Sequence, residues 1–337
     1  MSTSTTDFAC LVSEFLTEYL PLQRNYSKNT VLSYRDALKL LVVFITDTKG
    51  IRLTDFTMKC FDRQLIVEFL EWLRNRGVSV STANQRLAAI KAFAEYASCQ
   101  YIEYMAPLQM VQNIKSKKTS NREIVFLSVE QTTKLINQPD INTRTGLRHR
   151  TVMTLLYDSG CRVQELCDIK IRDVYTGTNP TVRLHGKGNK YRTVTISEKT
   201  AALVSEYIRR QRSSALDDEP LIINRTNEKL TRDGVNYIIS KYVSEIRRTE
   251  QNFPEKVHAH GFRHSKAMHM LAAGINIVYI RDFLGHEDIS TTMIYSKADN
   301  RLKNEAINNL APKVVDDVGF QDWTKDQALL SFLNSFK

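Results

Sequence analysis

Apolar residues recur at every third or fourth position along most of the first hundred residues, which is the spacing of helices with one buried face. The pattern predicts four helices packed as a small bundle. The first carries its apolar stripe from Phe8 to Tyr19 and is expected to stop at Pro21, because proline has no backbone N–H to donate. The second helix is expected to begin at a cap on Ser27 or Thr30. The third is expected to run from about Arg63 to Arg76, and the fourth to begin at a cap on Ser81.

The second half of the chain mixes helical spacing with one stretch of strict alternation. Ser128 and Gln131 form a capping-box pair, and an apolar helical run (151–160) ends at Gly160. Residues 181–196 alternate around a GKGN turn, which predicts a β-hairpin. The fold class is therefore expected to be mainly α with a small β-sheet: a helical domain followed by a mixed α/β domain. Further helical runs are expected at 199–212, at 233–246 and across the window 258–298.

A polar, basic stretch separates these two regions. Residues 113–123 (NIKSKKTSNRE) show no apolar period and are typical of a linker. A chain of 337 residues is long for one core and suits two domains. The predicted organisation is a helical domain at 1–113, a basic linker at 114–127, a mixed α/β domain at 128–311 and a tail at 312–337.

Composition narrows the class of protein. A hydrophobic content of 42% and a charged content of 25% are typical of soluble globular proteins. No apolar run reaches the roughly 18 residues that span a bilayer, and the N-terminal residues lack the basic region of a secretory signal. The five cysteines form no CxxC pair, which favours reduced thiols. We therefore expect a cytoplasmic protein with no membrane partner.

The net charge of +10 is unevenly distributed. Residues 1–113 carry +1, residues 114–127 carry +3 and residues 128–337 carry +6. A positive field favours a polyanionic partner such as DNA or RNA, although charge alone does not identify one. The candidate phosphate contacts lie on helical segments and in the linker, with a solvated face as the alternative for each: Arg86, Lys91, Lys115, Lys117, Lys118, Arg232 and Lys241.

Five of the seven histidines fall within the window 258–298, interleaved with arginines and followed by Tyr295. A metal site is one interpretation, but the window has no HExxH motif, no cysteine and no carboxylate at ligand spacing, so we expect neither a metal nor another cofactor. A phosphate site is the alternative. His260 and Arg263 share a helix face, and Gly285 and His286 follow a second short helix whose end can direct an imidazole toward them.

These residues carry a resemblance to a known family. The positions His260, Arg263, His286 and Tyr295 resemble the C-terminal motif of the tyrosine recombinases, the phage-integrase family. The intervals of 23 residues from arginine to histidine and of nine from histidine to tyrosine are those of the family.

Earlier motifs of the family follow in the expected order. The segment SGCRVQELCDI (159–169) is similar to the family's first-arginine motif and places that arginine at Arg162, with the acidic residue at Glu165. The hairpin is similar to the family's lysine hairpin and places the lysine at Lys187. The N-terminal helices are similar to its core-binding domain, so the resemblance covers roughly 8–310. Phe262, Ser265–Lys266 and Ser296–Lys297 depart from the common motif and favour a mobile-element branch over the housekeeping resolvases of chromosome dimers.

The resemblance implies an enzyme that cleaves and rejoins DNA strands, and the chemistry of the side chains agrees. A phenol with a pKa of about 10 is a weak nucleophile unless cations stabilise the phenolate and the charge on the phosphate. We expect Tyr295 to form a covalent 3′-phosphotyrosyl bond, which conserves the phosphodiester energy. The expected helpers are Arg162, Arg263 and His286 on the phosphate, His260 as the base, Lys187 as the acid for the 5′-oxygen, and Glu165 as an orienting group.

The resemblance also implies partners. The DNA partners are double-stranded recombination sites in the nucleoid. The protein partners are further copies of the chain, as a dimer on each site and a homotetramer that passes through a Holliday junction. Where recombination has a direction, an accessory DNA-bending or directionality protein is also expected.

Two alternatives remain open: a type IB topoisomerase that relaxes supercoils, and a DNA-binding regulator that does not use Tyr295. The tail carries one apolar stripe that either docks on a neighbouring protomer, as in the family, or covers its own domain: Leu329, Phe332, Leu333 and Phe336.

The remaining histidines and one tyrosine have ordinary structural interpretations. We expect His149 and His185 to face solvent, and His264 and His269 to pack or cap along their helix. Tyr279 lies in the apolar run INIVYI and is expected to belong to the core.

Overall fold

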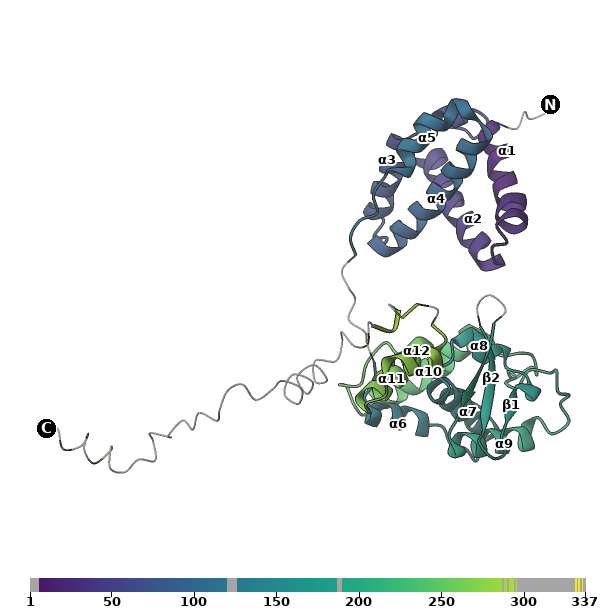
Figure 1. The fold of residues 1–337 in the computed structure, drawn as a ribbon, viewed down its shortest axis with the longest axis vertical. Helices are drawn as coiled ribbons and strands as arrows, with labels where there is room; N and C mark the ends of the chain where they lie inside the picture. The colour runs from purple at the N-terminus through teal and green to yellow at the C-terminus, as the bar shows by residue number, and fades with distance from the viewer. Residues whose placement is uncertain are drawn as a thin grey trace. The chain divides into compact units, whose positions relative to one another are not determined.

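The chain folds into two compact units, Met1–Arg122 and Glu123–Lys337, each with its own hydrophobic core (Figure 1). The computed structural model describes residues 6–119, 126–186, 190–286, 288–289, 291–293, 295, 331, 333 and 335. Within these residues, no helix is both long enough and apolar enough to cross a bilayer.

The first unit is a helical bundle with an aromatic centre. The rings of Phe15 and Phe61 both meet Phe93 edge to face, with ring centroids 5.4 Å apart in each pair. Phe8 joins them at 5.7 Å from Phe93. The α-helices of this unit are α1 (Asp7–Glu14), α2 (Lys28–Val43), α3 (Arg63–Asn75), α4 (Val80–Gln100) and α5 (Met105–Gln112).

Three sequence predictions for this unit need correction. Pro21 does not stop the first helix, because the chain continues as a π-helical segment, Phe15–Gln23. In a π-helix each N–H donates to the carbonyl five residues back, and this wider turn accommodates the one donor that proline lacks. The cap of α4 is Ser79, whose hydroxyl accepts the Thr82 N–H at 3.2 Å, and Ser81 lies inside the helix. A fifth helix, α5, buries Leu108 and Val111 and had been missed because it is only two turns long.

The first residues of the predicted linker pack on the bundle. Ile114 is buried in the core of the first unit. Asn84 and Lys117 exchange two hydrogen bonds: the Asn84 amide donates to the Lys117 carbonyl at 2.8 Å and accepts the Lys117 N–H at 3.0 Å. The lysine side chains at 115, 117 and 118 are exposed on this tethered segment.

The second unit combines helices with a three-stranded antiparallel sheet in the order β1-β2-β3. The predicted hairpin is present, with Val182 opposite Val194 and His185 opposite Tyr191. The mainly helical fold with one small sheet is thus confirmed (Figure 1). Its elements are α6 (Val129–Asn137), α7 (Arg144–Asp158), α8 (Val163–Asp168), β1 (Val174–Tyr175), β2 (Thr181–His185), β3 (Tyr191–Thr195), α9 (Glu198–Gln211), α10 (Arg232–Arg247), α11 (Ala259–Ala272) and α12 (Ile277–Leu284).

Helix α11 is fastened to its surroundings by a histidine. The Nε2 of His269 lies 2.9 Å from the Leu127 carbonyl and its Nδ1 lies 2.9 Å from the Tyr157 hydroxyl. A carbonyl only accepts, so Nε2–H donates to Leu127 and, in a neutral ring, the Tyr157 hydroxyl donates to Nδ1. His269 therefore has the packing role that the sequence predicted.

Two burial predictions are wrong. His149 is 3% exposed and bonds to Tyr242, because it faces inward from α7 rather than toward solvent. Tyr279 is 69% exposed, because α12 turns Ile280 and Leu284 inward and leaves Tyr279 on its outer face. His185, on the hairpin, is exposed as predicted.

Candidate active site

A cavity of about 450 Å³ opens between the β2–β3 hairpin, the start of α8 and the turn after α12. Three basic side chains and an imidazole line it. The residues that line it are Arg162, Gly186, Lys190, Tyr191, Arg192, Gly285, His286, Asp288 and Thr291.

One carboxylate holds the two arginines of this cavity. The Glu165 side chain is 4% exposed and accepts from Arg162 Nη1 at 2.8 Å and from Arg192 Nη1 and Nη2 at 2.9 and 2.7 Å. It also accepts the Arg162 backbone N–H at 2.8 Å, closing the first turn of α8. Burial alone would raise the pKa of Glu165, but the hydrogen bonds from Arg192 and Arg162 outweigh it and lower the pKa to about 2. Glu165 is therefore ionised and orients both guanidinium groups.

The sequence prediction missed Arg192. This arginine lies on β3, is 16% exposed in its side chain, and makes the bidentate contact to Glu165. A signal was present, since Lys190 and Arg192 occupy alternate positions of the predicted strand and so share one face of the hairpin.

Arg263 connects two segments that lead to residues of the cavity. It is 1% exposed, and its Nη1 donates to the Gly160 carbonyl at 2.8 Å and its Nη2 to the Leu284 carbonyl at 2.7 Å. These bonds use two of the five guanidinium N–H groups and leave three donors. Burial, together with the nearby Arg162, lowers the pKa of Arg263 to about 10, so it stays charged at neutral pH.

His286 is placed by a left-handed glycine. Gly285 ends α12 at φ +66°, and a Cβ there would come within 2.9 Å of the Arg192 side chain, so another residue would be strained and crowded. His286 Nδ1 lies 2.8 Å from the buried Thr292 hydroxyl. Burial, with Arg263 and Arg162 close by, lowers the pKa of His286 to about 4. A neutral ring that accepts from Thr292 at Nδ1 carries its proton on Nε2, ready to donate.

The phenol of Tyr295 is buried and bonded to a histidine. Tyr295 is 1% exposed, and its hydroxyl lies 2.9 Å from His264 Nδ1. Burial raises the pKa of Tyr295 more than Arg263 lowers it, so the phenol is protonated. The ring of His264 lies 4.2 Å from that of His260, measured between centroids. His264, which the sequence assigned to packing, therefore contacts the predicted nucleophile; its i, i+4 spacing from His260 was the available signal.

The structure thus gathers most of the predicted set. Arg162 and His286 line the cavity, and Glu165 contacts it through its bonds to Arg162 and Arg192, while Arg263 and Tyr295 are not among the lining residues. Lys187 and residues 312–337, apart from 331, 333 and 335, lie outside the described residues. Gly186 and Lys190, the described residues on either side of 187–189 in the sequence, line the cavity, and the Gly186 N–H donates to the Lys190 carbonyl at 2.8 Å.

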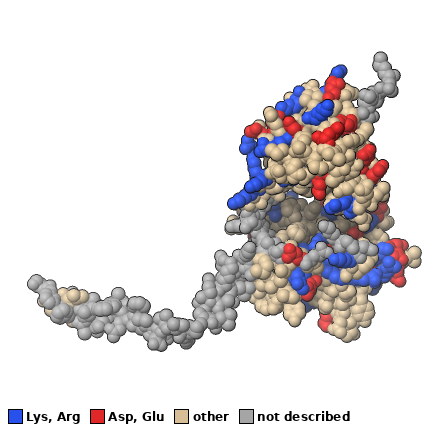
Figure 2. All heavy atoms as spheres, turned by 45° about the horizontal axis from the view of Figure 1, so that its top comes forward, with Lys and Arg blue, Asp and Glu red and all other residues tan. Residues whose placement is uncertain are grey.

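The predicted DNA contacts lie on both units. Arg86 and Lys91 are half-buried on α4, and Arg232 and Lys241 are exposed on α10. Figure 2 shows Lys and Arg side chains on each unit, with a group of them gathered on one side of the second. Among the residues that the structure describes, no cluster of three or more His, Cys, Asp or Glu is arranged to hold a metal ion.

Comparisons with known proteins agree with this arrangement. The Phage integrase family matches residues 125–301, and the Phage integrase, N-terminal SAM-like domain matches residues 13–100. An integrase/recombinase of Sinorhizobium fredii is 31% identical over 329 residues, covering 97% of this chain and 98% of the relative. Tyrosine recombinase XerD of Staphylococcus haemolyticus is 29% identical, covering 90% of this chain and 99% of the relative.

Solved structures show the same fold. XerH site-specific recombinase bound to palindromic difH substrate, in a post-cleavage complex, matches with a TM-score of 0.66 and 22% identity over 93% of this chain and 92% of the other. The Tn1549 transposon integrase in complex with circular intermediate DNA matches with a TM-score of 0.68 and 16% identity over 89% and 99%. The chain therefore belongs to the phage integrase family and is a site-specific tyrosine recombinase.

Proposed function

We propose that the Tyr295 hydroxyl attacks the scissile phosphate of a recombination site and forms a 3′-phosphotyrosyl bond while the 5′-oxygen leaves. One observation carries this proposal: Glu165 aligns Arg162 and Arg192 in a cavity that also holds His286, next to the helix that bears Arg263. Three guanidinium groups and a neutral imidazole supply charge and hydrogen bonds to a phosphate whose negative charge grows in the transition state.

The proton movements follow from the ionisation of the site. Burial lowers the pKa of His260, so it is neutral and able to accept the phenol proton as Tyr295 attacks. His286 donates from Nε2 to a non-bridging oxygen. Lys187 protonates the departing 5′-oxygen, a role supported by the position of its neighbours Gly186 and Lys190 at the cavity. No step requires a metal or a nucleotide.

The Tyr295 hydroxyl must leave His264 before it reaches the phosphate. It is buried against the His264 ring, and Tyr295 is not among the residues that line the cavity. We infer that this arrangement is the resting form of the enzyme, and that DNA in the cavity favours the form in which the phenol faces the phosphate.

Recombination then proceeds through pairs of strand exchanges. We propose a dimer on each site, a homotetramer on two sites and a Holliday junction between the exchanges. Residues 1–113, the linker 114–127 and residues 128–311 all contact DNA through the basic residues named above. The tail, 312–337, docks on a neighbouring protomer. The departures at Phe262 and Ser265–Lys266 and the fold shared with a transposon integrase support integration or excision of a mobile element in the bacterial nucleoid.

A nicked suicide DNA tests the proposal. Cleavage beside the nick releases a short strand, so a covalent protein–DNA product cannot be religated and accumulates on a denaturing gel. We expect such a product with wild-type protein, and expect it also in EDTA. Binding without any covalent product would instead favour the DNA-binding regulator, and relaxation of supercoiled plasmid by monomers would favour a topoisomerase.

A further inference from the structure

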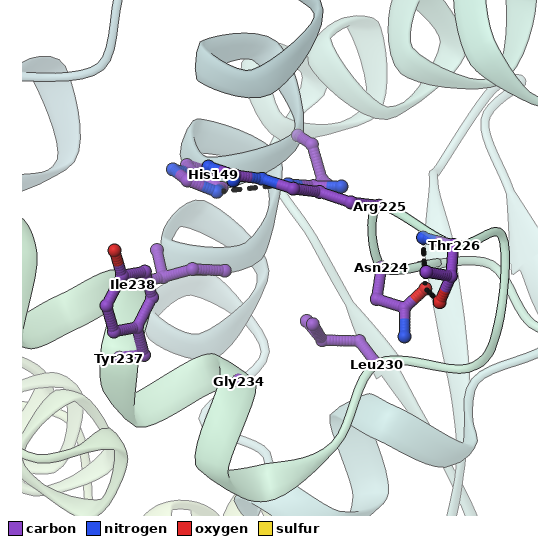
Figure 3. A pocket seen from close by; sticks show the side chains of 9 residues that line it. His149, Asn224, Arg225, Thr226, Leu230, Gly234, Tyr237 and Ile238 are labelled. Atoms are coloured by element: carbon purple, nitrogen blue, oxygen red, sulfur yellow. Dashed lines mark hydrogen bonds between the residues drawn. The ribbon is translucent and has the colours of Figure 1, made fainter.

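A second pocket lies in the same unit and shares no lining residue with the active-site cavity. It has a volume of about 340 Å³, and three elements form it: α7, the loop before α10, and the first turns of α10 (Figure 3). Its lining residues are Arg148, His149, Asn224, Arg225, Thr226, Leu230, Gly234, Tyr237 and Ile238, none of which is acidic.

The innermost charge of this pocket is a buried arginine without a counter-ion. Arg148 is 8% exposed, and within the described part of the chain it forms no salt bridge. Its Nη1 donates to the Ile223 carbonyl at 3.4 Å and its Nη2 to His149 at 3.3 Å, both long, and its buried Nε has no partner. Because a guanidinium stays protonated, this side chain carries a full positive charge whose removal from water is poorly compensated.

His149 cannot supply the missing charge, but it fixes the direction of Arg148. The guanidinium only donates, so His149 Nε2 accepts and its Nδ1–H donates to the Tyr242 hydroxyl 3.0 Å away. Burial, then Arg148, Lys241 and Arg225, lower the pKa of His149 to about 4, which keeps the ring neutral.

The mouth of the pocket is cationic and polar. Arg225 is exposed there, and within the residues described it has no ion pair. The one carboxylate of this loop, Glu228, lies outside the lining and already accepts from Thr226 Oγ1 at 2.9 Å and from Asn224 at 3.3 Å. Burial lowers the pKa of Arg148, and Arg225 and Arg144 lower it further, which is the expected effect of cations gathered without a shared anion.

We propose that this pocket binds a phosphate group, held by Arg148 from within and Arg225 at the mouth. Two guanidinium groups present several N–H donors, which suits an anion with oxygens on more than one side. The phosphate comes either from the backbone of bound DNA, beside the exposed Arg232 of α10, or from free phosphate in solution. The first source rests on the DNA contact proposed above for α10, and the second is independent of it.

Thermal unfolding of the full chain in phosphate, against chloride at matched ionic strength, tests the site. Phosphate stabilises many proteins without a specific site. The readout is therefore the difference in the phosphate-induced rise in Tm between Arg225→Gln and the control Arg209→Gln. The control removes the same charge from α9, outside the pocket. We expect wild type and Arg209→Gln to gain the same increase in Tm, and Arg225→Gln and Arg148→Met to lose most of it. If Arg148→Met fails to fold, Arg225→Gln alone tests whether the rise in Tm depends on this pocket.

The salt dependence of DNA affinity separates the two sources. A contact to a backbone phosphate predicts that Arg225→Gln lowers the slope of log Kd against log salt by about 1 relative to Arg209→Gln. An unchanged slope with a phosphate-dependent Tm assigns the site to free phosphate. If Arg225→Gln and Arg209→Gln respond alike in both measurements, the pocket is no phosphate site and the proposal is wrong.

Discussion

The proposed phosphate-binding half of the active site and the half that bears the proposed nucleophile are held in different ways. Arg162, Arg192 and Glu165 form a charged network in which the carboxylate accepts from both arginines, so their positions are set before any ligand arrives. Tyr295 instead packs against His264 and is hydrogen-bonded to it, with its hydroxyl buried and protonated. In the proposed mechanism, phosphate binding is therefore preorganised, whereas presentation of the Tyr295 hydroxyl is a separate step that DNA must favour.

Arg263 belongs to both halves. Its bonds to Gly160 and Leu284 connect the loop that leads into α8 with the turn that places His286. Gly160 itself has φ +57°, and a Cβ there would come within 2.8 Å of the Phe283 ring, so the carbonyl that Arg263 contacts depends on glycine. The same side chain thus supports the fold and retains donors, which the proposed mechanism assigns to the phosphate.

The largest effect is expected from Tyr295→Phe. This change removes only the hydroxyl, so the variant should fold, bind the recombination site as wild type does, and form no covalent DNA product. Gel-shift titration measures the binding, and the suicide DNA measures the product. A Phe variant that still forms the product at the usual rate would show that another residue is the nucleophile.

Arg162→Ala removes one charged contact from the preorganised half. We expect adduct formation to fall on the order of 10²-fold or more, since a lost transition-state contact to a developing charge has this effect. Arg172→Ala, an exposed arginine paired with Asp218 away from the cavity, is the matched control and should keep the wild-type rate. Equal rates for the two variants would place the scissile phosphate elsewhere.

Glu165→Gln keeps the shape of the network but removes its negative charge. The folded pKa of about 2 lies below the usual value near 4.3, so the charge stabilises the fold above about pH 4.3 and this contribution is lost as the pH falls toward 2. We therefore expect the variant to be less stable by about 3 kcal/mol at pH 7, with a difference that shrinks below pH 4.3.

Urea unfolding across this pH range measures that difference. Glu245→Gln, which breaks an exposed pair with Lys241, serves as the control and should cost under about 1 kcal/mol at every pH. A pH-independent loss in Glu165→Gln would mean that the carboxylate charge does not hold the two arginines.

The smallest effect is expected from loss of the hydrogen bond between His264 and the buried Tyr295 hydroxyl. His264→Phe removes the hydrogen bond that holds the Tyr295 hydroxyl, which is worth about 1 kcal/mol. If leaving His264 limits adduct formation on saturating DNA, the rate should rise about fivefold, and His264→Gln, which can still bond, should stay near wild type. Slower cleavage in His264→Phe would show that His264 assists the reaction instead.

The sequence predicted the helices and the hairpin because each depends on local pattern. Ser128 with Gln131 caps its helix as expected, and the hairpin at 181–196 forms around the predicted turn. The proposed reacting groups, Arg263, His286 and Tyr295 among them, were assigned from the spacing that the family shares, and their roles stay predictions.

What the sequence did not predict depends on contacts between distant segments. Arg192 joins the site only because Glu165, 27 positions away, accepts both of its Nη groups. His149 and Tyr279 were placed on the wrong side because a helix face is set by its neighbours, not by the local apolar run. The His264 contact to Tyr295 spans 31 positions and could not be derived from either residue alone.

The most direct measurement is to map the covalent bond. Wild-type protein is trapped on suicide DNA and digested with protease and nuclease, and the residual nucleotide-bearing peptide is sequenced by mass spectrometry. The proposed mechanism predicts a peptide modified at Tyr295 through a 3′-phosphate, with a free 5′-hydroxyl on the released strand. A bond at any other residue, or a 5′-phosphate linkage, would contradict it.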